Sequence, residues 1–170
     1  MADLPPFDPY AILAALERRR VACIVIGGFA RVVQGAEEIT DGVDIVPSLR
    51  GENLRRLGLA LDELGAERVD GGALVLNEAA IREELMIALR SPRGELKVVP
   101  EPAGTRGGYN DLRRAATREP IGKGLRPSIA STADLARMLA ALNREADMQK
   151  LRALRRLTEL ERGLGPDLGL

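Results

Sequence analysis

Histidine is absent from this chain of 170 residues, and cysteine occurs once, at position 23. The lack of histidine excludes Ser-His and Cys-His nucleophile pairs and metal centres built on imidazole, and Cys23 alone has no partner for an internal disulfide. Tryptophan is also absent, and aromatic residues make up 2% of the sequence, too few for a nucleic-acid groove lined with stacking side chains. Most hydrolase mechanisms are therefore excluded, and Cys23, among apolar neighbours, is expected to be an inert core side chain.

The chain also lacks an excess of charge of either sign, since 25 Lys and Arg residues balance 25 Asp and Glu residues. Without net charge, no overall field attracts the protein to nucleic acid or to an anionic membrane, so a partner must be recognised locally. No run approaches the roughly 18 consecutive apolar residues of a membrane helix, and the acidic, proline-rich start has no apolar segment typical of a secretion signal. We therefore expect a cytoplasmic protein with no membrane partner.

The whole sequence is 45% apolar and 29% charged, which is typical of a soluble globular protein. At roughly 150 residues per domain, the length predicts one domain over residues 1–162, followed by a flexible tail over 163–170. We find neither an internal repeat nor a linker.

Apolar runs rich in β-branched residues predict buried strands over 21–26 and 43–46, and the turn residues 91–94 predict an antiparallel hairpin over 85–99. Helices are expected over 8–20, 29–34, 48–64, 77–83, 109–117, 131–142 and 147–162, and further short strands over 67–70, 73–76 and 125–129. Helices gathered around a small mixed sheet favour an α+β fold over a doubly wound one.

Gly27 and Gly28 lie between the first predicted strand and a short helix. They leave free amide groups with no side chain in the way of an approaching anion, so this turn can hold a phosphate. A tight turn that needs positive φ at both residues is the other interpretation, and the two glycines alone favour it.

The stretch from Gly27-Gly28 through Gly35 to Thr40 and the strand at 43–46 resembles the nucleotidyltransferase superfamily. It looks most similar to the small single-domain branch of abortive-infection and minimal nucleotidyltransferase toxins. The similarity extends over roughly residues 20–160. It implies a polymerase beta-like α+β fold, with a small mixed sheet flanked by helices and C-terminal helices.

The resemblance also assigns roles to particular residues. It implies that Gly27, Gly28, Thr40 and Asp147 contact the nucleotide, and that Asp44 is the catalytic carboxylate that binds magnesium. In this superfamily, two carboxylates on one strand and a third on its neighbour hold the metal. Residues i and i+2 of a strand point to the same face, so such carboxylates converge on ions about 3.5–4 Å apart.

Two of these three carboxylate positions are substituted, because the first falls on Gly42 and the third on Lys97. Glu38 also stands where the superfamily often has arginine, and Ala146 where it has lysine. At an effective dielectric of about 20, a lysine about 4 Å from a divalent ion is repelled by roughly 8 kcal/mol before relaxation. We therefore expect weak or absent magnesium binding, and we expect Lys97 to pair with Asp44.

Three functions stay open. The first is a nucleotidyltransferase-fold pseudoenzyme of the toxin-like branch, which binds a nucleotide or an RNA end without efficient transfer. The second is an active magnesium-dependent toxin that transfers a nucleoside monophosphate to tRNA or protein, with Asp44 helped by Glu95, or by Asp41 through a β-bulge at Gly42. The third is a non-catalytic partner-binding domain. A nucleoside triphosphate, tRNA and a cognate antitoxin are the partners that the resemblance leaves open.

Overall fold

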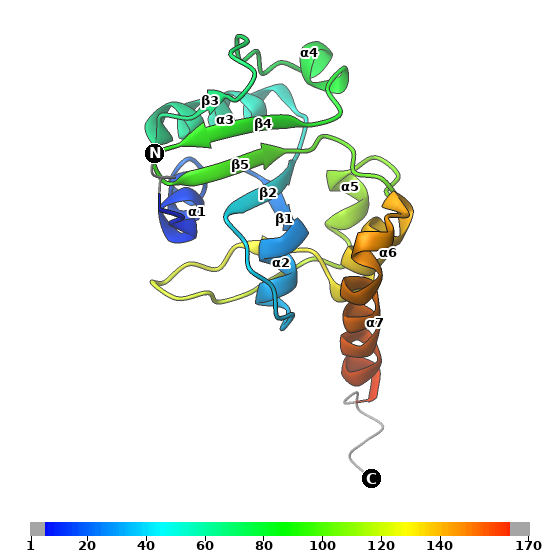
Figure 1. Ribbon diagram of the computed structural model, residues 1–170. Coiled ribbons are helices and arrows are strands. Elements are labelled where there is room, and N and C mark those ends of the chain that lie inside the picture. The colour runs from blue at the N-terminus through cyan, green and yellow to red at the C-terminus, as the bar shows by residue number, and fades with distance from the viewer. Residues whose placement is uncertain (1–5, 164–170) are drawn as a thin grey trace, which may run out of the picture.

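The computed structural model describes residues 6–163, which fold around one seven-stranded mixed sheet (Figure 1). The strands are β1 (Cys23–Ile26), β2 (Gly42–Pro47), β3 (Glu67–Arg68), β4 (Ile87–Ser91), β5 (Gly94–Val98), β6 (Thr117–Arg118) and β7 (Ser128–Ile129). The helices are α1 (Pro9–Arg18), α2 (Gly27–Val33), α3 (Gly51–Leu64), α4 (Glu78–Arg82), α5 (Tyr109–Leu112), α6 (Thr132–Leu142), the 3₁₀ turn η1 (Glu145–Asp147) and α7 (Met148–Gly163). The α+β class predicted from the sequence is confirmed.

The strand order is β3-β4-β5-β2-β1-β7-β6. The pairs β2/β5 and β1/β7 are parallel, and the other neighbours are antiparallel. The predicted tail over 163–170 lies outside the described residues, apart from Gly163 at the end of α7.

Alternation along the central strands gives the sheet two different faces. Val43 and Ile45 of β2 are fully buried, and Figure 1 shows α1 and α3 behind the sheet on that side. Asp44, between them, is half-buried and points to the opposite face, because successive side chains of a strand alternate. The same alternation in β5 places Lys97 on the face that carries Asp44. The sheet therefore buries one face in the core and presents a polar strip on the other.

Several local signals in the sequence are realised as predicted. The strands β4 and β5 form the expected hairpin around residues 91–94. Gly65 ends α3 in the left-handed region, with φ of +66°. Asn77 caps α4 through a 2.8 Å bond from the Ala80 amide, and Ser131 caps α6. Each of these features depends on residues close in sequence, which is why the sequence alone predicts them.

Other segments differ from expectation because pairing between distant segments decides them. The helix predicted over 109–117 ends at Leu112, and Thr117, its predicted last residue, belongs to β6, which pairs with β7. The strand predicted over 125–129 is reduced to Ser128–Ile129, which pairs in parallel with β1. Residues 73–76 form no strand, and α3 begins at Gly51 without a cap from Ser48.

The helices α6 and α7 pack against each other along one side of the molecule, at the right of Figure 1. Leu135 and Leu139 of α6 and Leu151 and Leu154 of α7 are buried. Within residues 6–163, no helix is both long and apolar enough to cross a membrane.

Candidate functional site

A cleft of about 530 Å³ opens on the polar face of the sheet. Asp44 and Lys97 line it from the strands, and Gly27, Gly28 and Arg31 line it from the first turns of α2. Its volume lies within the range of roughly 300–1,000 Å³ that is common for small-molecule sites. The structure thus brings together four residues that the sequence singled out and adds Arg31.

Asp44 and Lys97 are register partners in the parallel pair β2/β5. The expected direct contact between them is not among the ion pairs formed within residues 6–163, so that expectation is wrong as stated. The two groups still interact electrostatically. Burial raises the pKa of the Asp44 carboxyl above its ordinary value, and the charges of Lys97 and then Arg31 oppose that rise.

Gly27 leaves the space that the Asp44 carboxylate occupies. A Cβ at Gly27 would lie 2.5 Å from Asp44 Oδ2, and the Gly27 φ of +73° is itself unfavourable for other residues. A Cβ at Gly28 would lie 3.5 Å from Thr40 Oγ1, and Gly28 has no positive φ. Gly27 therefore needs both its positive φ and the close approach to Asp44, whereas at Gly28 a Cβ would make an ordinary contact with Thr40.

Arg31 is held by the carboxylate of Glu38, which lies in the loop after α2. Its Nε and Nη2 donate to the two carboxylate oxygens of Glu38 at 2.6 and 3.0 Å. Both side chains are nearly buried, at 12% and 11% exposed, and Lys150 Nζ of α7 lies 3.7 Å from the same carboxylate. This bidentate pair was not predicted. Arg31 and Glu38 are seven residues apart, on either side of the end of α2, and no sequence pattern predicts that their side chains meet.

Glu95 of β5 is the register partner of Gly42 and so lies on the face of Asp44, but neither Glu95 nor Asp41 lines the cleft. The ladder between β2 and β5 runs without interruption from Gly42/Glu95 to Ile45/Val98, so these strands lack the bulge that would turn Asp41 inward. Asp41 is exposed and precedes the strand. A Cβ at Gly42 would lie 2.9 Å from the Glu95 carbonyl oxygen, so the two backbones are tightly packed here.

Asp147 does not line the cleft. It is buried in η1, where it forms an ion pair with Arg144, and Arg144 is the residue that lines the cleft. Asp147 can therefore affect a ligand in the cleft only indirectly, by holding the Arg144 side chain in position.

The far wall of the cleft is apolar, which the sequence did not indicate. It is formed by side chains of α6 and the residues just before β4, namely Leu85, Met86, Leu135, Met138, Leu139 and Leu142. Leu85 is 91% exposed, so part of this wall is open to solvent. The leucine spacing of α6 predicted an apolar helix face, but only the packing shows that part of this face borders a cavity.

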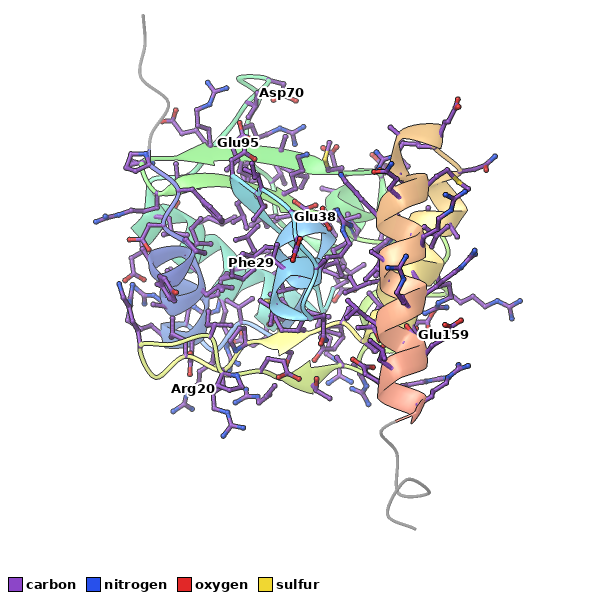
Figure 2. The ribbon with its side chains drawn as sticks, turned by 60° about the horizontal axis from the view of Figure 1, so that its bottom comes forward. Arg20, Phe29, Glu38, Asp70, Glu95 and Glu159 are labelled. Carbon is purple, nitrogen blue, oxygen red and sulfur yellow. The ribbon has the colours of Figure 1, made fainter. Side chains whose placement is uncertain are left out.

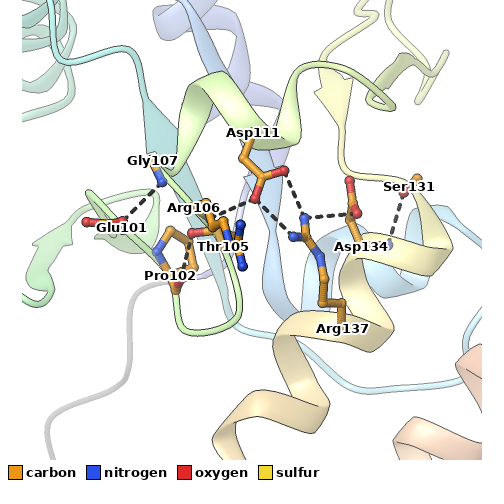
Figure 3. A network of polar contacts seen from close by, with 9 residues as sticks. All are labelled: Glu101, Pro102, Thr105, Arg106, Gly107, Asp111, Ser131, Asp134 and Arg137. Atoms are coloured by element: carbon orange, nitrogen blue, oxygen red, sulfur yellow. Dashed lines mark hydrogen bonds and ion pairs between the residues drawn. The ribbon is translucent and has the colours of Figure 1, made fainter.

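A polar network fixes the loop that contributes Glu101, Pro102 and Ala103 to the lining of the cleft (Figure 3). Asp111 accepts two hydrogen bonds from the Arg137 guanidinium, at 2.9 and 3.2 Å, and a third from the Arg106 amide at 2.7 Å. These bonds hold the pKa of Asp111 below its ordinary value. Arg137 also donates to Asp134 of α6, so the loop that carries Glu101 is tied to that helix.

The donor set around Asp44 does not fit a pair of magnesium ions. Among residues 6–163, no group of three or more His, Cys, Asp and Glu side chains is arranged to hold a metal. Magnesium prefers oxygen ligands and is commonly held by carboxylates together with substrate phosphates. Asp44 supplies one such carboxylate, Gly42 supplies none, and Lys97 brings a positive charge.

Cys23 has no chemical role in the cleft. It lies in β1, where burial raises the pKa of its thiol to about 12. The thiol therefore stays protonated at neutral pH and is a weak nucleophile.

No protein-family model and no curated protein sequence matches this chain. Several solved structures resemble it over most of its length. The lincosamide antibiotic adenylyltransferase LnuA, bound to lincomycin, has a TM-score of 0.60 at 14% identity and covers 89% of this chain and 99% of its own. The antibiotic-resistance factor ANT(2'')-Ia has a TM-score of 0.58 at 16% identity and covers 89% and 81%. A putative nucleotidyltransferase from Thermotoga maritima has a TM-score of 0.53 at 14% identity and covers 88% and 89%.

The chain has the nucleotidyltransferase fold. That conclusion concerns the fold alone, because the identities are low. Within the nucleotidyltransferase fold, membership of the toxin-like branch and the roles of Asp44, Thr40 and Asp147 stay predictions.

Proposed function

We propose that this protein binds a nucleoside triphosphate in the cleft beside Asp44 and Lys97 and does not transfer its nucleotide by a two-metal mechanism. The observation that carries the proposal is the register pairing of Asp44 with Lys97, at a position where an active site of this fold would have an acid. A lysine there attracts phosphate and repels a divalent cation, so it favours binding of the substrate and disfavours the metal-assisted step.

The shape of the cleft supports a nucleotide as the ligand. Its apolar wall on α6 offers a surface for a base, and Lys97 of β5 and Arg144, which follows α6, bring positive charge to the same cleft. LnuA is an adenylyltransferase by name, and ANT(2'')-Ia has been captured with adenylyl-2''-tobramycin, so two proteins of this fold handle adenylyl groups. Adenylyl transfer requires that a nucleotide is bound and that its nucleotidyl group is transferred. The residues of this cleft suit the binding step and not the two-metal transfer step.

Isothermal titration with ATP and with CTP, in magnesium and in EDTA, tests the proposal. We expect binding in EDTA with an affinity close to that in magnesium. Loss of Lys97 in Lys97→Gln removes a charge-assisted contact and is expected to weaken binding about tenfold. The matched control Lys123→Gln changes a lysine in the turn between β6 and β7, outside the cleft, and should bind like the unaltered protein.

Two outcomes would overturn the proposal. If neither nucleotide binds, the proposal is wrong and a non-catalytic partner-binding domain becomes the favoured function. If binding requires magnesium and is followed by release of pyrophosphate, the protein is an active transferase and the single carboxylate is sufficient. An RNA with a 5′ triphosphate, titrated in parallel, distinguishes an RNA end from a free nucleotide as the preferred ligand.

A further inference from the structure

A second cavity, of about 490 Å³, lies on the opposite face of the sheet. Val25 lines it, whereas the next residue of β1, Ile26, lines the candidate cleft. Because successive strand residues point to opposite faces, the two cavities are separated by the sheet. The second cavity is therefore independent of the nucleotide proposal.

Three arginines from separate segments line this second cavity. Arg20 follows α1, Arg118 belongs to β6, and Arg126 precedes β7. None of the three takes part in the ion pairs formed within residues 6–163. Glu17 is the one carboxylate among the lining residues, so the lining carries a net charge of +2.

Arg20 occupies a backbone position that favours glycine. The amide of Val21 donates to the Leu16 carbonyl and the amide of Arg20 to the Glu17 carbonyl, which is the pattern of a Schellman motif at the end of α1. Arg20 is the left-handed residue of that motif, with φ of +53°. A side chain costs stability there, and Figure 2 shows Arg20 beside the segment that joins β6 and β7. An arginine at this position is easier to explain by binding than by folding.

The floor of the cavity is apolar. Leu13 and Leu16 of α1 and Val25 of β1 form it, together with Tyr109 at the start of α5. Arg118 and Ser128 are register partners across β6 and β7, so a guanidinium and a hydroxyl lie side by side at its edge. An apolar floor with cationic walls suits a ligand that has an organic body and an anionic end.

We propose that this back cavity binds a small phosphate monoester, with the phosphate at Arg20, Arg118 and Arg126 and the organic part on the apolar floor. A phosphate monoester carries roughly −1.5 to −2 charges at pH 7, which matches the net charge of the lining. Guanidinium groups bind phosphate oxygens in a bidentate manner, and three of them surround the dianion from different elements.

Phenyl phosphate is the probe, because it has the required dianion and an aromatic body but no nucleoside. Its binding is followed by NMR on the arginine Nε–H signals of the full chain. We expect the signals of Arg20, Arg118 and Arg126 to shift together, and inorganic phosphate to bind about tenfold more weakly because it gains nothing from the floor. If inorganic phosphate binds equally well, or if all arginine signals shift alike, no such site exists.

Arg20→Gly separates binding from folding. Glycine suits the left-handed position, so the melting temperature should rise, while the affinity for phenyl phosphate should fall about tenfold. Arg118→Gln should weaken binding by a similar factor. The control Arg152→Gln, on the exposed part of α7, should leave it unchanged. If Arg20→Gly binds phenyl phosphate as tightly as Arg152→Gln and the unaltered protein do, the proposal is wrong.

Discussion

Asp44 of β2 and Lys97 of β5 are register partners in neighbouring parallel strands, so an acid and a base project from the sheet into the same cleft. Burial and Lys97 act in opposite directions on the pKa of Asp44, and burial has the larger effect. The first two predictions below follow from the opposite effects of burial and of the Lys97 charge on the pKa of Asp44.

Removal of the lysine charge should make Asp44 harder to ionise. In Lys97→Met the pKa of Asp44 is expected to rise further, because burial then acts with only Arg31 as the opposing cation. A titration of the Asp44 carboxyl carbon by NMR measures this directly. Lys123→Met is the matched control and should leave the titration unchanged. A pKa of Asp44 that stays constant or falls in Lys97→Met would show that the two charges do not interact.

Asp44 should destabilise the fold when it is ionised. Its pKa in the folded chain is raised above the ordinary 3.8, so the folded state binds more protons than the unfolded state between those two values. Stability from this group is therefore lost as the pH rises through that window. Asp44→Asn should be more stable than the unaltered protein at pH 7, and the difference should disappear below pH 3.8.

Urea unfolding at several pH values measures this difference. The control Asp41→Asn changes an exposed neighbour and should stay within about 0.5 kcal/mol of the unaltered protein at each pH. If Asp44→Asn is the less stable protein at pH 7, its carboxylate is stabilised by contacts that this account omits.

Gly42 should tolerate no larger side chain without cost. A Cβ there would lie 2.9 Å from the Glu95 carbonyl oxygen, and the backbone of β5 would have to move. We expect Gly42→Ala to lower the free energy of unfolding by about 1–3 kcal/mol. Gly58→Ala is the control, since a Cβ in the middle of α3 meets only Leu76 at 3.7 Å. It should raise stability by about 0.5–1 kcal/mol, as alanine does in helices, and two changes of equal sign would contradict the packing argument.

Glu38 should compete with a bound nucleotide for Arg31. In Glu38→Gln the Arg31 guanidinium loses its bidentate partner and becomes available to phosphate, so ATP affinity is expected to rise about threefold to tenfold. The same change should lower the free energy of unfolding by about 1–3 kcal/mol, because a nearly buried charge loses its partner. Calorimetric titration and urea unfolding check the two effects.

Glu52→Gln is the control for that change. Glu52 pairs with Arg55 on the exposed face of α3, at 2.9 Å, and exposed pairs contribute about 0–1 kcal/mol. ATP affinity should be the same as in the unaltered protein. A fall in ATP affinity in Glu38→Gln would show that the acidic side chain positions Arg31 for the ligand instead of withholding it.

The sequence predicted those parts of the fold that depend on neighbouring residues. The hairpin at 91–94, the stop at Gly65 and the cap at Ser131 each need only a few consecutive side chains. The parallel pairing of β7 with β1 was not predicted, since Val25 and Ile129 are far apart in the chain. The same pairing takes Thr117, the last residue of the helix predicted over 109–117, into β6.

For the candidate site, the resemblance named Gly27, Gly28, Asp44 and Lys97, and two strands and one turn bring all four into one cleft. The resemblance implied that Asp147 contacts the nucleotide, whereas the fold buries Asp147 and places its partner Arg144 at the cleft. The apolar wall and the Arg31 pair depend on how α6 and the loop after α2 pack against the sheet. No local pattern contains that information.

Transfer of a label from nucleoside triphosphates is the most direct test of the central claim. The protein is incubated with α-labelled triphosphates, magnesium or manganese, and bulk tRNA, next to Lys97→Asp and the double variant Gly42→Asp with Lys97→Asp, whose folding is checked by circular dichroism. The account predicts no labelled protein or RNA with the unaltered chain. Strong metal-dependent labelling by the unaltered chain, lost in Asp44→Asn, would contradict it.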